Sequence, residues 1–187
     1  MRKLSSFIFH KIMGWKMIGD FDEDNIKKCV VIAVPHTSWH DFYIGLLIRQ
    51  VAGVKISFMG KKELFKWPFG WYFRKVGGIA LDRTPGQNKV EAIAKEFEKR
   101  NELRLTLAPE GTRKKVSSWK TGFYYIAQAA NVPILMVAFD FGKKQVVISS
   151  PFYPTDDIEK DLQSMYGFFK GVKGKIPEYS FEPEPEV

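Results

Sequence analysis

The sequence predicts an α/β fold in a single domain, with a mixed, mostly parallel sheet flanked by helices. Continuous apolar runs, such as residues 29–34, are typical of strands that are covered on both faces. These runs alternate along the chain with segments whose apolar residues recur at helical spacing, which is the pattern of α/β proteins. With 187 residues and 45% hydrophobic content, the chain can bury one substantial core. We therefore expect one domain and not two.

Residues 1–20 predict an amphipathic N-terminal helix. Phe7, Ile12 and Trp15 recur at roughly helical spacing, with basic residues nearby. Such a helix could lie on an anionic membrane, or it could be an ordinary terminal helix that packs on the core. The residues leave both interpretations open.

The folded domain is expected over residues 21–176. Its strands follow apolar runs, and its helices follow apolar stripes that return after three or four residues. The strands are predicted, in chain order, at 29–34, 55–59, 78–81, 103–108, 134–141 and 145–150. The helices are predicted from Thr37 or Ser38 to Gly53, and through the stripes at 90–97, 123–130 and 158–169.

The last part of the chain predicts a hairpin, a helix and a tail. A short turn around Gly142 and Lys143 joins the last two strands, so we expect them to add an antiparallel edge to the sheet. Asp157 suits the start of the last helix, where the helix dipole favours acids. Residues 177–187 end in alternating proline and glutamate and predict a disordered acidic tail.

Composition limits the partners and the compartment. The formal charge of +8 and the pI near 9.4 indicate an anionic partner, but nucleic acid, anionic lipid and a phosphorylated substrate all satisfy this requirement. The single cysteine, Cys29, excludes an internal disulfide framework and a cysteine-based zinc cluster, and it fits a reducing cytoplasm. No uncharged apolar run reaches about 18 residues, so we expect no transmembrane helix. No signal peptide is predicted.

The densest polar group follows the first buried strand, where open α/β sheets commonly bind ligands. If His36 lies in the turn before the helix, the Asp41 carboxylate can reach one ring nitrogen and leave the other free to accept a proton. Two other interpretations compete with this one. Asp41 could complete a capping box opened by Ser38. Alternatively, His36, His40 and Asp41 could bind a metal ion.

A second polar turn, residues 109–113, follows another predicted strand and has the features of an anion-binding loop. Gly111 lets the backbone approach a ligand closely, and the planar guanidinium of Arg113 suits phosphate. A carboxylate among phosphate ligands would oppose binding, so we expect Glu110 to orient the loop.

Two further segments stand out. Asp82 and Arg83 form a third charged turn after a strand, which is either a surface ion pair or part of a site shared with the other two turns. The stretch 67–73 is too aromatic for a typical solvated loop. It could line an acyl groove, touch lipid or belong to the core.

In their order and spacing, these segments resemble the four sequence blocks of the glycerophospholipid acyltransferase family, which includes the 1-acylglycerol-3-phosphate acyltransferases. The resemblance covers roughly residues 30–140. His36 and Asp41 match the first block, residues 78–83 match the second, and residues 109–113 match the third in full.

The chain departs from the family pattern at two places. Pro35 stands where the family usually has asparagine before the histidine, and Met136 stands where the fourth block usually has proline. Neither residue is the proposed base. We therefore expect these departures to affect the choice of acceptor and not the reaction.

The resemblance implies a glycerol-3-phosphate acyltransferase-like fold and direct acyl transfer, with His36 as general base and Asp41 orienting it. The donor would be acyl-CoA or acyl-carrier protein, and the acceptor 1-acylglycerol 3-phosphate. Neither a metal ion nor a cofactor is implied. Glycerol 3-phosphate, a lyso-ornithine lipid and other lysolipids are alternative acceptors. The residues implied to contact the substrate are Lys61, Asp82, Arg83, Glu110, Gly111, Thr112 and Arg113.

We expect a cytoplasmic protein that is peripheral on the inner face of the cell membrane and uses the anionic membrane surface as a partner. The rival class is a nucleic-acid-binding domain. We do not expect a nucleic-acid partner, because the aromatic residues gather in the block at 67–73 and no nucleic-acid module is visible. A lipid-surface module with a degenerate site is disfavoured by the presence of His36, Asp41, Glu110 and Arg113 together.

Overall fold

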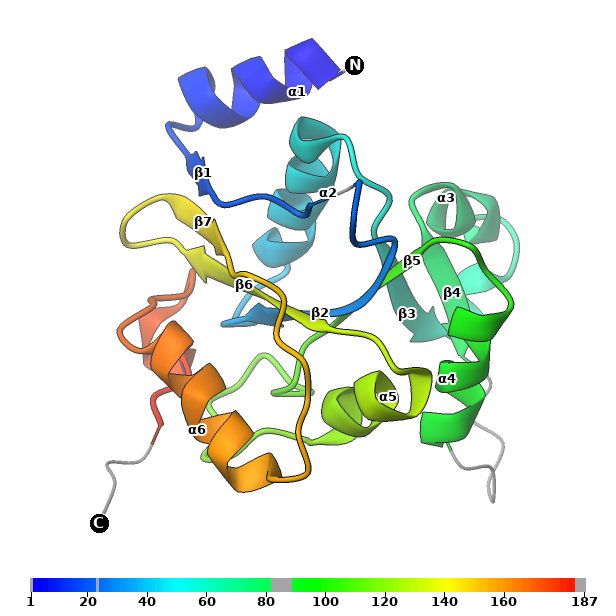
Figure 1. The fold of residues 1–187 in the computed structure, drawn as a ribbon. Coiled ribbons are helices and arrows are strands. Elements are labelled where there is room, and N and C mark those ends of the chain that lie inside the picture. The colour runs from blue at the N-terminus through cyan, green and yellow to red at the C-terminus, as the bar shows by residue number, and fades with distance from the viewer. Residues whose placement is uncertain (1, 23, 82–88, 184–187) are drawn as a thin grey trace.

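A computed structural model describes residues 2–22, 24–81 and 89–183 of the chain (Figure 1). These residues form a single sheet with helices on both faces, which confirms the predicted fold class. The order of the strands across the sheet is β1-β7-β6-β2-β5-β3-β4. The strands are β1 (Lys16–Ile18), β2 (Lys28–Val34), β3 (Ser57–Lys61), β4 (Gly78–Leu81), β5 (Leu103–Leu107), β6 (Ile134–Asp140) and β7 (Gln145–Ile148).

The α-helices of the described residues are α1 (Arg2–Phe7), α2 (His40–Ala52), α3 (Gly70–Lys75), α4 (Lys89–Glu98), α5 (Gly122–Ala130) and α6 (Ile158–Phe169). The π-helix η1 (Ile8–Ile12) and the 3-10 helices η2 (Lys62–Phe65) and η3 (Pro177–Tyr179) complete the set. Among the helices described, none is both long and apolar enough to cross a bilayer.

Two predicted helix ends are explained by local chemistry. Helix α2 closes at Gly53, whose φ of 81° lies in the left-handed region that glycine adopts without strain. Helix α6 opens at Asp157, whose carboxylate accepts a hydrogen bond from the backbone N–H of Lys160 at 3.1 Å.

The directions of the strands confirm the predicted mixed sheet but correct its edge. Strands β2 to β6 pair in parallel, and β7 pairs antiparallel to β6 as the predicted hairpin. However, β7 is not an edge strand, because β1 pairs with its other side in parallel. The three residues of β1 are too few to show a strand pattern in the sequence.

The N-terminal helix is shorter than the prediction over residues 1–20. Helix α1 and η1 end at Ile12, and Gly14, with a φ of 71°, turns the chain into β1. Phe9 and Trp15 are buried against the sheet, whereas Phe7 is exposed. The segment therefore packs on the core with one side and keeps apolar side chains on the other.

The side chains of β2 alternate between two cores, as a strand covered on both faces requires. Val30 and Ile32 contribute to the core beneath α4, α5 and α6. Val31 contributes to the core beneath α2 and η1. Figure 1 shows α2 and the other three helices on opposite sides of the sheet. The central strand is thus fixed by packing from both directions.

The thiol of Cys29 lies in the second of these cores and is fully buried. Burial raises its pKa to about 12, although the positive charge of Arg104 acts in the opposite direction. The thiol therefore stays protonated at neutral pH and is not a nucleophile.

The C-terminal segment is folded, contrary to the disordered tail predicted over residues 177–187. Phe181 is buried, and its ring centroid lies 5.0 Å from the rings of Trp119 and Tyr166. Ser180 Oγ accepts a hydrogen bond from the backbone N–H of Gly174 at 2.9 Å. The surrounding prolines and glutamates masked this anchor in the sequence. The end of the predicted tail, 184–187, lies outside the described residues.

If Phe181 anchors the C-terminal segment, Phe181→Ala should lower the free energy of unfolding by about 3 kcal/mol, because it removes a buried aromatic ring from the cluster around Trp119. Tyr179→Ala is the matched control, since Tyr179 is exposed and should contribute clearly less. Urea unfolding measures both. Equal midpoints for wild type and Phe181→Ala would show that the segment is not part of the cooperative core.

Candidate active site

The turn after β2 carries the candidate catalytic pair. Strand β2 is paired on both sides, with β5 and with β6, so its end is held in a fixed position. His36 lies in the turn that follows, and α2 begins at His40. Because β2, β5 and β3 are parallel, the turns that follow them lie at the same edge of the sheet.

Asp41 organises this turn with a single carboxylate oxygen. Its Oδ2 accepts hydrogen bonds from His36 Nδ1 at 3.0 Å and from the backbone N–H groups of Thr37 and Ser38 at 2.9 Å each. The carboxylate is buried, where hydrogen bonds to a charged group are strong. Since Nδ1 donates to Asp41, Nε2 is the basic nitrogen of the ring. Within the described residues, Nε2 makes no hydrogen bond.

The base interpretation and the capping interpretation of Asp41 describe the same carboxylate. Its bond to the Ser38 N–H is the contact that the capping interpretation requires of Asp41, but the N-cap residue of α2 is Trp39 and not Ser38, so the predicted capping box is not formed. Its bond to His36 is the orienting bond that a general base needs. The geometry does not support the metal interpretation. His40 Nδ1 is 2.9 Å from Ser38 Oγ, and its ring stacks on Trp39 at 4.0 Å, so it does not converge with His36 and Asp41.

Glu110 links the turn after β5 to the turn after β2. Its Oε2 accepts a hydrogen bond from the backbone N–H of His36 at 2.7 Å, and the residue is only 2% exposed. Two carboxylates from different turns therefore hold one histidine. Asp41 fixes the ring of His36, and Glu110 fixes its main chain.

Burial raises the pKa of Glu110 to about 7. The hydrogen bond from the His36 N–H and the charge of His36 act to lower this pKa, whereas the negative charge of Asp41 acts to raise it. Close to neutral pH, Glu110 is thus distributed between its protonated and ionised forms, although its ordinary pKa would leave it fully ionised.

An apolar cavity of about 270 Å³ opens beside His36 and Asp41. One wall is a face of α2 that includes Gly45 and Arg49. Asp41 and Arg49 are two turns apart, so this wall extends about 12 Å along the helix. The guanidinium of Arg49 donates a hydrogen bond to the carbonyl of Val76. The other lining residues include Phe42, Leu46, Phe58, Met59, Val76 and Thr106. An apolar cavity of this kind suits an alkyl chain.

The loop beyond Glu110 is exposed and basic. Gly111 has a φ of 64°, and a Cβ at this position would lie 2.8 Å from Lys120 Nζ. Glycine therefore allows Lys120 to lie against the loop. Thr112 Oγ1 accepts a hydrogen bond from the backbone N–H of Lys114 at 3.3 Å, and Arg113 is exposed. The loop thus offers cations to solvent beside the candidate catalytic pair.

The sequence pattern of the acyltransferase family matches residues 20–140, which include β2, the His36 turn, the cavity and the Glu110 turn. The chain belongs to the acyltransferase family. Membership confirms the family that the sequence blocks indicate.

The chain is similar to proteins named 1-acyl-sn-glycerol-3-phosphate acyltransferase. The Saccharomyces cerevisiae protein is 29% identical over 130 residues, which cover 65% of this chain and 41% of that protein. The Haemophilus influenzae protein is 34% identical over 123 residues, which cover 62% of this chain and 49% of that protein. The Streptococcus pneumoniae protein is 29% identical over 136 residues, which cover 68% of this chain and 50% of that protein. This chain thus spans half or less of the length of each relative.

A solved structure shares the fold. The crystal structure of the 1-acyl-sn-glycerophosphate acyltransferase of Thermotoga maritima superimposes with a TM-score of 0.60 at 22% identity. The superposition covers 89% of this chain and 74% of that one. The predicted acyltransferase-like fold is therefore confirmed.

The structure of this member of the acyltransferase family brings together only part of the predicted site. His36, Asp41 and Glu110 are in contact, and the exposed residues 111–113 follow directly. Lys61 ends β3 at the same edge of the sheet, but only its backbone is described. The predicted substrate residues Asp82 and Arg83 lie outside the described residues.

The residues that shape the cavity were missed in the sequence. Gly45 lies within α2, and a Cβ built on it meets no atom within 4 Å, so it borders open space. A glycine inside a helix lowers the stability of that helix. Its presence at position 45 was therefore a sign in the sequence that the position has another role. Arg49 gave no signal, because a single arginine near the end of a helix is ordinary.

The raised pKa of Glu110 predicts a pH-dependent stability. Glu110 ionises at lower pH in the unfolded chain than in the folded one. Its contribution to the free energy of unfolding is therefore complete below pH 4.5 and is lost as the pH rises through about 7. Glu110→Gln cannot ionise, and its amide oxygen can still accept from the His36 N–H. Between acid pH and pH above 7, the free energy of unfolding of Glu110→Gln relative to wild type should therefore rise by about 3 kcal/mol.

Urea unfolding at a series of pH values measures this difference. A constant difference between the two proteins at all pH values would show that Glu110 titrates in the folded protein as it does in the unfolded chain.

Proposed function

We propose that this chain transfers a fatty acyl group from an acyl thioester to the free hydroxyl of 1-acylglycerol 3-phosphate, giving phosphatidate. The observation that carries the proposal is the pair of His36 Nδ1 and Asp41 Oδ2, 3.0 Å apart, at the wall of an apolar cavity. The names of the relatives support the acceptor. Because the chain spans half or less of their length, the complete activity is an inference for this protein.

The proposed reaction needs one base and no protein nucleophile. His36 Nε2 takes the proton of the acceptor hydroxyl as the hydroxyl oxygen attacks the carbonyl carbon of the thioester. The carbon–sulfur bond then breaks, and the leaving thiolate takes the proton from the imidazolium. Asp41 stabilises that imidazolium through Nδ1. A general base of this kind contributes about 10² to 10⁴ in rate. The products are an ester and a free thiol.

The two substrates would reach His36 from different directions. The acyl chain would occupy the apolar cavity, which brings its carbonyl carbon to the histidine. The phosphate of the acceptor would bind at the basic loop through Gly111, Thr112 and Arg113, with Lys61, Asp82 and Arg83 as further predicted contacts. Glu110 would act through the main chain of His36, since its carboxylate is buried beneath the turn. Acyl-CoA and acyl-carrier protein both fit as donors, because both are anionic.

We also propose that the N-terminal segment contacts an anionic membrane. Leu4, Phe7 and Ile12 are exposed on α1 and η1, and Lys3 and Lys11 are exposed beside them. This combination of apolar and basic side chains is typical of interfacial helices. Location on the inner face of the cell membrane stays a prediction.

Thiol release from palmitoyl-CoA in the presence of lysophosphatidate tests the reaction. His36→Ala should reduce lysophosphatidate-dependent turnover by about 10² to 10⁴, because the base is lost. His40→Ala is the matched control and should retain most of the turnover, since its ring is bonded to Ser38 and not to Asp41. Acyl-carrier protein, glycerol 3-phosphate and other lysolipids are then tested as substrates. Wild-type turnover in purified His36→Ala would remove His36 as the base.

The cavity predicts how chain length can be changed. Gly45→Leu should fill open space and shorten the preferred acyl chain, because no atom lies within 4 Å of a Cβ at Gly45. Gly45→Ala adds only one methyl group and should give a smaller shift in the same direction. Turnover with donors of increasing chain length measures the preference. An unchanged profile in Gly45→Leu, with the variant folded, would place the acyl chain elsewhere.

A further inference from the structure

The aromatic stretch between β3 and β4 neither lines the cavity nor belongs to the core. Trp67 is 92% exposed, Phe69 is 68% exposed and Trp71 is 64% exposed. Large aromatic side chains are normally half buried or more in a protein that meets only water. We call these three residues the aromatic knob. Such a group of exposed aromatic residues marks a surface that contacts something other than water.

The knob is held on a rigid support. Phe65, the last residue of η2, is buried, and its ring lies 6.3 Å from that of Phe73. A Cβ at Gly70 would lie 2.0 Å from the carbonyl oxygen of Phe65, so only glycine permits this close approach of η2 and α3. The backbone N–H of Gly70 also donates to the carbonyl of Lys66 at 2.8 Å. The side chains at the tip are therefore directed outward by packing beneath them.

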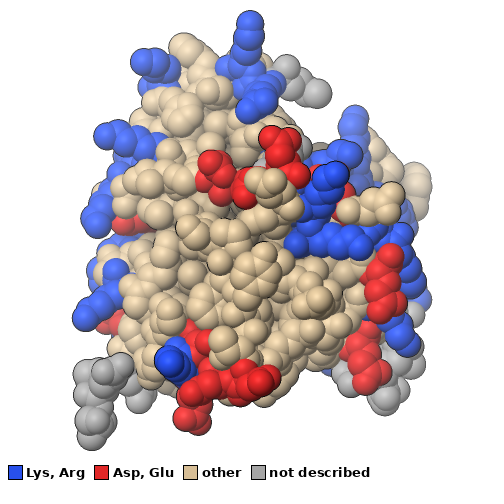
Figure 2. Space-filling model, in the orientation of Figure 1, with Lys and Arg blue, Asp and Glu red and all other residues tan. Residues whose placement is uncertain are grey.

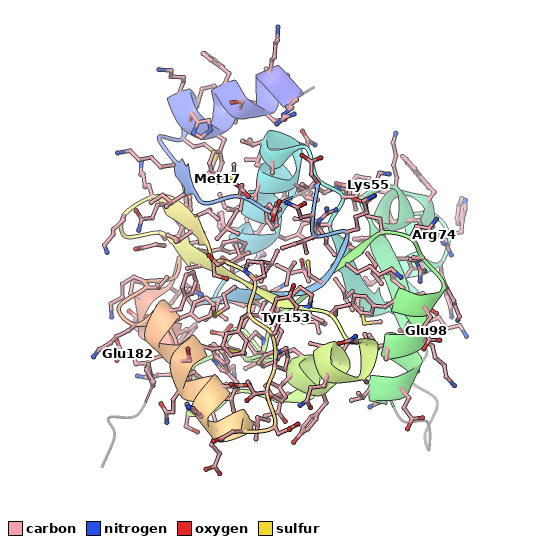
Figure 3. All side chains as sticks on the ribbon, in the orientation of Figure 1. Met17, Lys55, Arg74, Glu98, Tyr153 and Glu182 are labelled. Carbon is pink, nitrogen blue, oxygen red and sulfur yellow. The ribbon has the colours of Figure 1, made fainter. Side chains whose placement is uncertain are left out.

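The charges around the knob are mainly positive. The segment 62–77 contains four cations, at Lys62, Lys66, Arg74 and Lys75, and one acid, Glu63. Figure 2 shows Lys and Arg side chains gathered on the side of the molecule where α3 lies, and Figure 3 labels Arg74 there. The guanidinium of Arg74 stacks over the ring of Phe65 at 5.7 Å. This side thus complements a negative surface.

The position of the knob relates it to the active site. The segment begins where β3 ends, at the same edge of the sheet as the His36 turn. Phe58 and Met59 of β3, and Val76 after α3, line the cavity. Residues shortly before and directly after the elements that support the knob therefore line the cavity beside His36.

We propose that the aromatic knob inserts into the interface of an anionic lipid bilayer and forms a membrane contact separate from the N-terminal segment. Tryptophan is enriched at the boundary between lipid headgroups and acyl chains, because its ring is apolar and its N–H is polar. The cations of 62–77 then lie at the level of the anionic headgroups. The inference rests on the proposed function only in that a membrane acceptor gives this contact a purpose.

Co-sedimentation with phosphatidylcholine vesicles, with and without phosphatidylglycerol, tests the proposal. The variant Trp67→Ser/Phe69→Ser/Trp71→Ser should bind the mixed vesicles at least about tenfold more weakly than wild type. Trp67→Ser alone should weaken binding in the same direction, and it removes a side chain that makes few contacts with the protein. Thermal unfolding of each variant checks the fold.

Tyr153→Ser is the matched control. Tyr153 is also an exposed aromatic residue, but it lies in another region of the surface. It lines a pocket with Lys27 and Pro133, which precede β2 and β6 and so mark the opposite edge of the sheet, and Figure 3 labels it away from Arg74 of α3. Its loss should leave vesicle binding unchanged. Equal weakening of vesicle binding by Tyr153→Ser and Trp67→Ser would overturn the proposal. So would wild-type vesicle binding by the folded triple variant. A wild-type protein that does not bind the mixed vesicles would also overturn it.

Two further measurements distinguish the membrane contact from the proposed reaction and from self-association of the chain. With a short-chain lysophosphatidate dissolved as monomers, the triple variant should turn over like wild type, whereas with vesicle-borne acceptor its turnover should fall. No turnover by wild type would count against the proposed reaction and leave the binding result to decide the knob. Sedimentation equilibrium shows whether the knob joins two copies. A wild-type dimer that becomes monomeric in the triple variant, with unchanged vesicle binding, would assign the knob to self-association.

Discussion

The burial of one carboxylate beneath three hydrogen-bond donors is the constraint on which the active-site region depends. The Asp41 Oδ2 atom accepts hydrogen bonds from the His36 ring and from the next two backbone N–H groups. A buried carboxylate without donors is costly, so the three bonds to Oδ2 stabilise this arrangement of the turn, while Oδ1 is buried without a partner among the described residues. The same contacts fix the turn that leads into α2 and leave Nε2 as the His36 ring nitrogen without a partner among the described residues. Folding of the turn therefore also orients the His36 ring.

The sheet places the second carboxylate. Ile32 of β2 pairs with Leu107 of β5, so His36 and Glu110, which follow these residues by four and three positions, leave the sheet side by side. The 2.7 Å bond between them follows from this register. A shift of the pairing by one residue would reverse the faces of the side chains and separate the two turns. The cores on both sides of β2 therefore maintain the geometry of the site.

Sequence patterns identified the fold and the main polar contact for physical reasons. The run at 29–34 suits a strand that is covered on both faces, and the spacing of His36 and Asp41 allows a reach across one turn. The aromatic stretch at 67–73 showed the limit of this reasoning, because its composition fits a groove, a lipid contact or a core equally well. Only packing distinguishes the exposed Trp67 of this stretch from the buried Phe65, which comes just before it. The wall at Gly45 and the anchor at Phe181 depend on contacts between distant segments, which local pattern does not report.

The single thiol of the chain has a practical consequence for enzymology. Acyl transfer from a coenzyme A thioester liberates one thiol per turnover, and disulfide reagents that detect thiols react with the thiolate. Cys29 is fully enclosed and has a pKa of about 12, so the folded protein should contribute almost no colour of its own. Since the sequence contains no other cysteine, a protein-dependent signal would report unfolding. One reagent can thus follow turnover in the native state and register loss of that state.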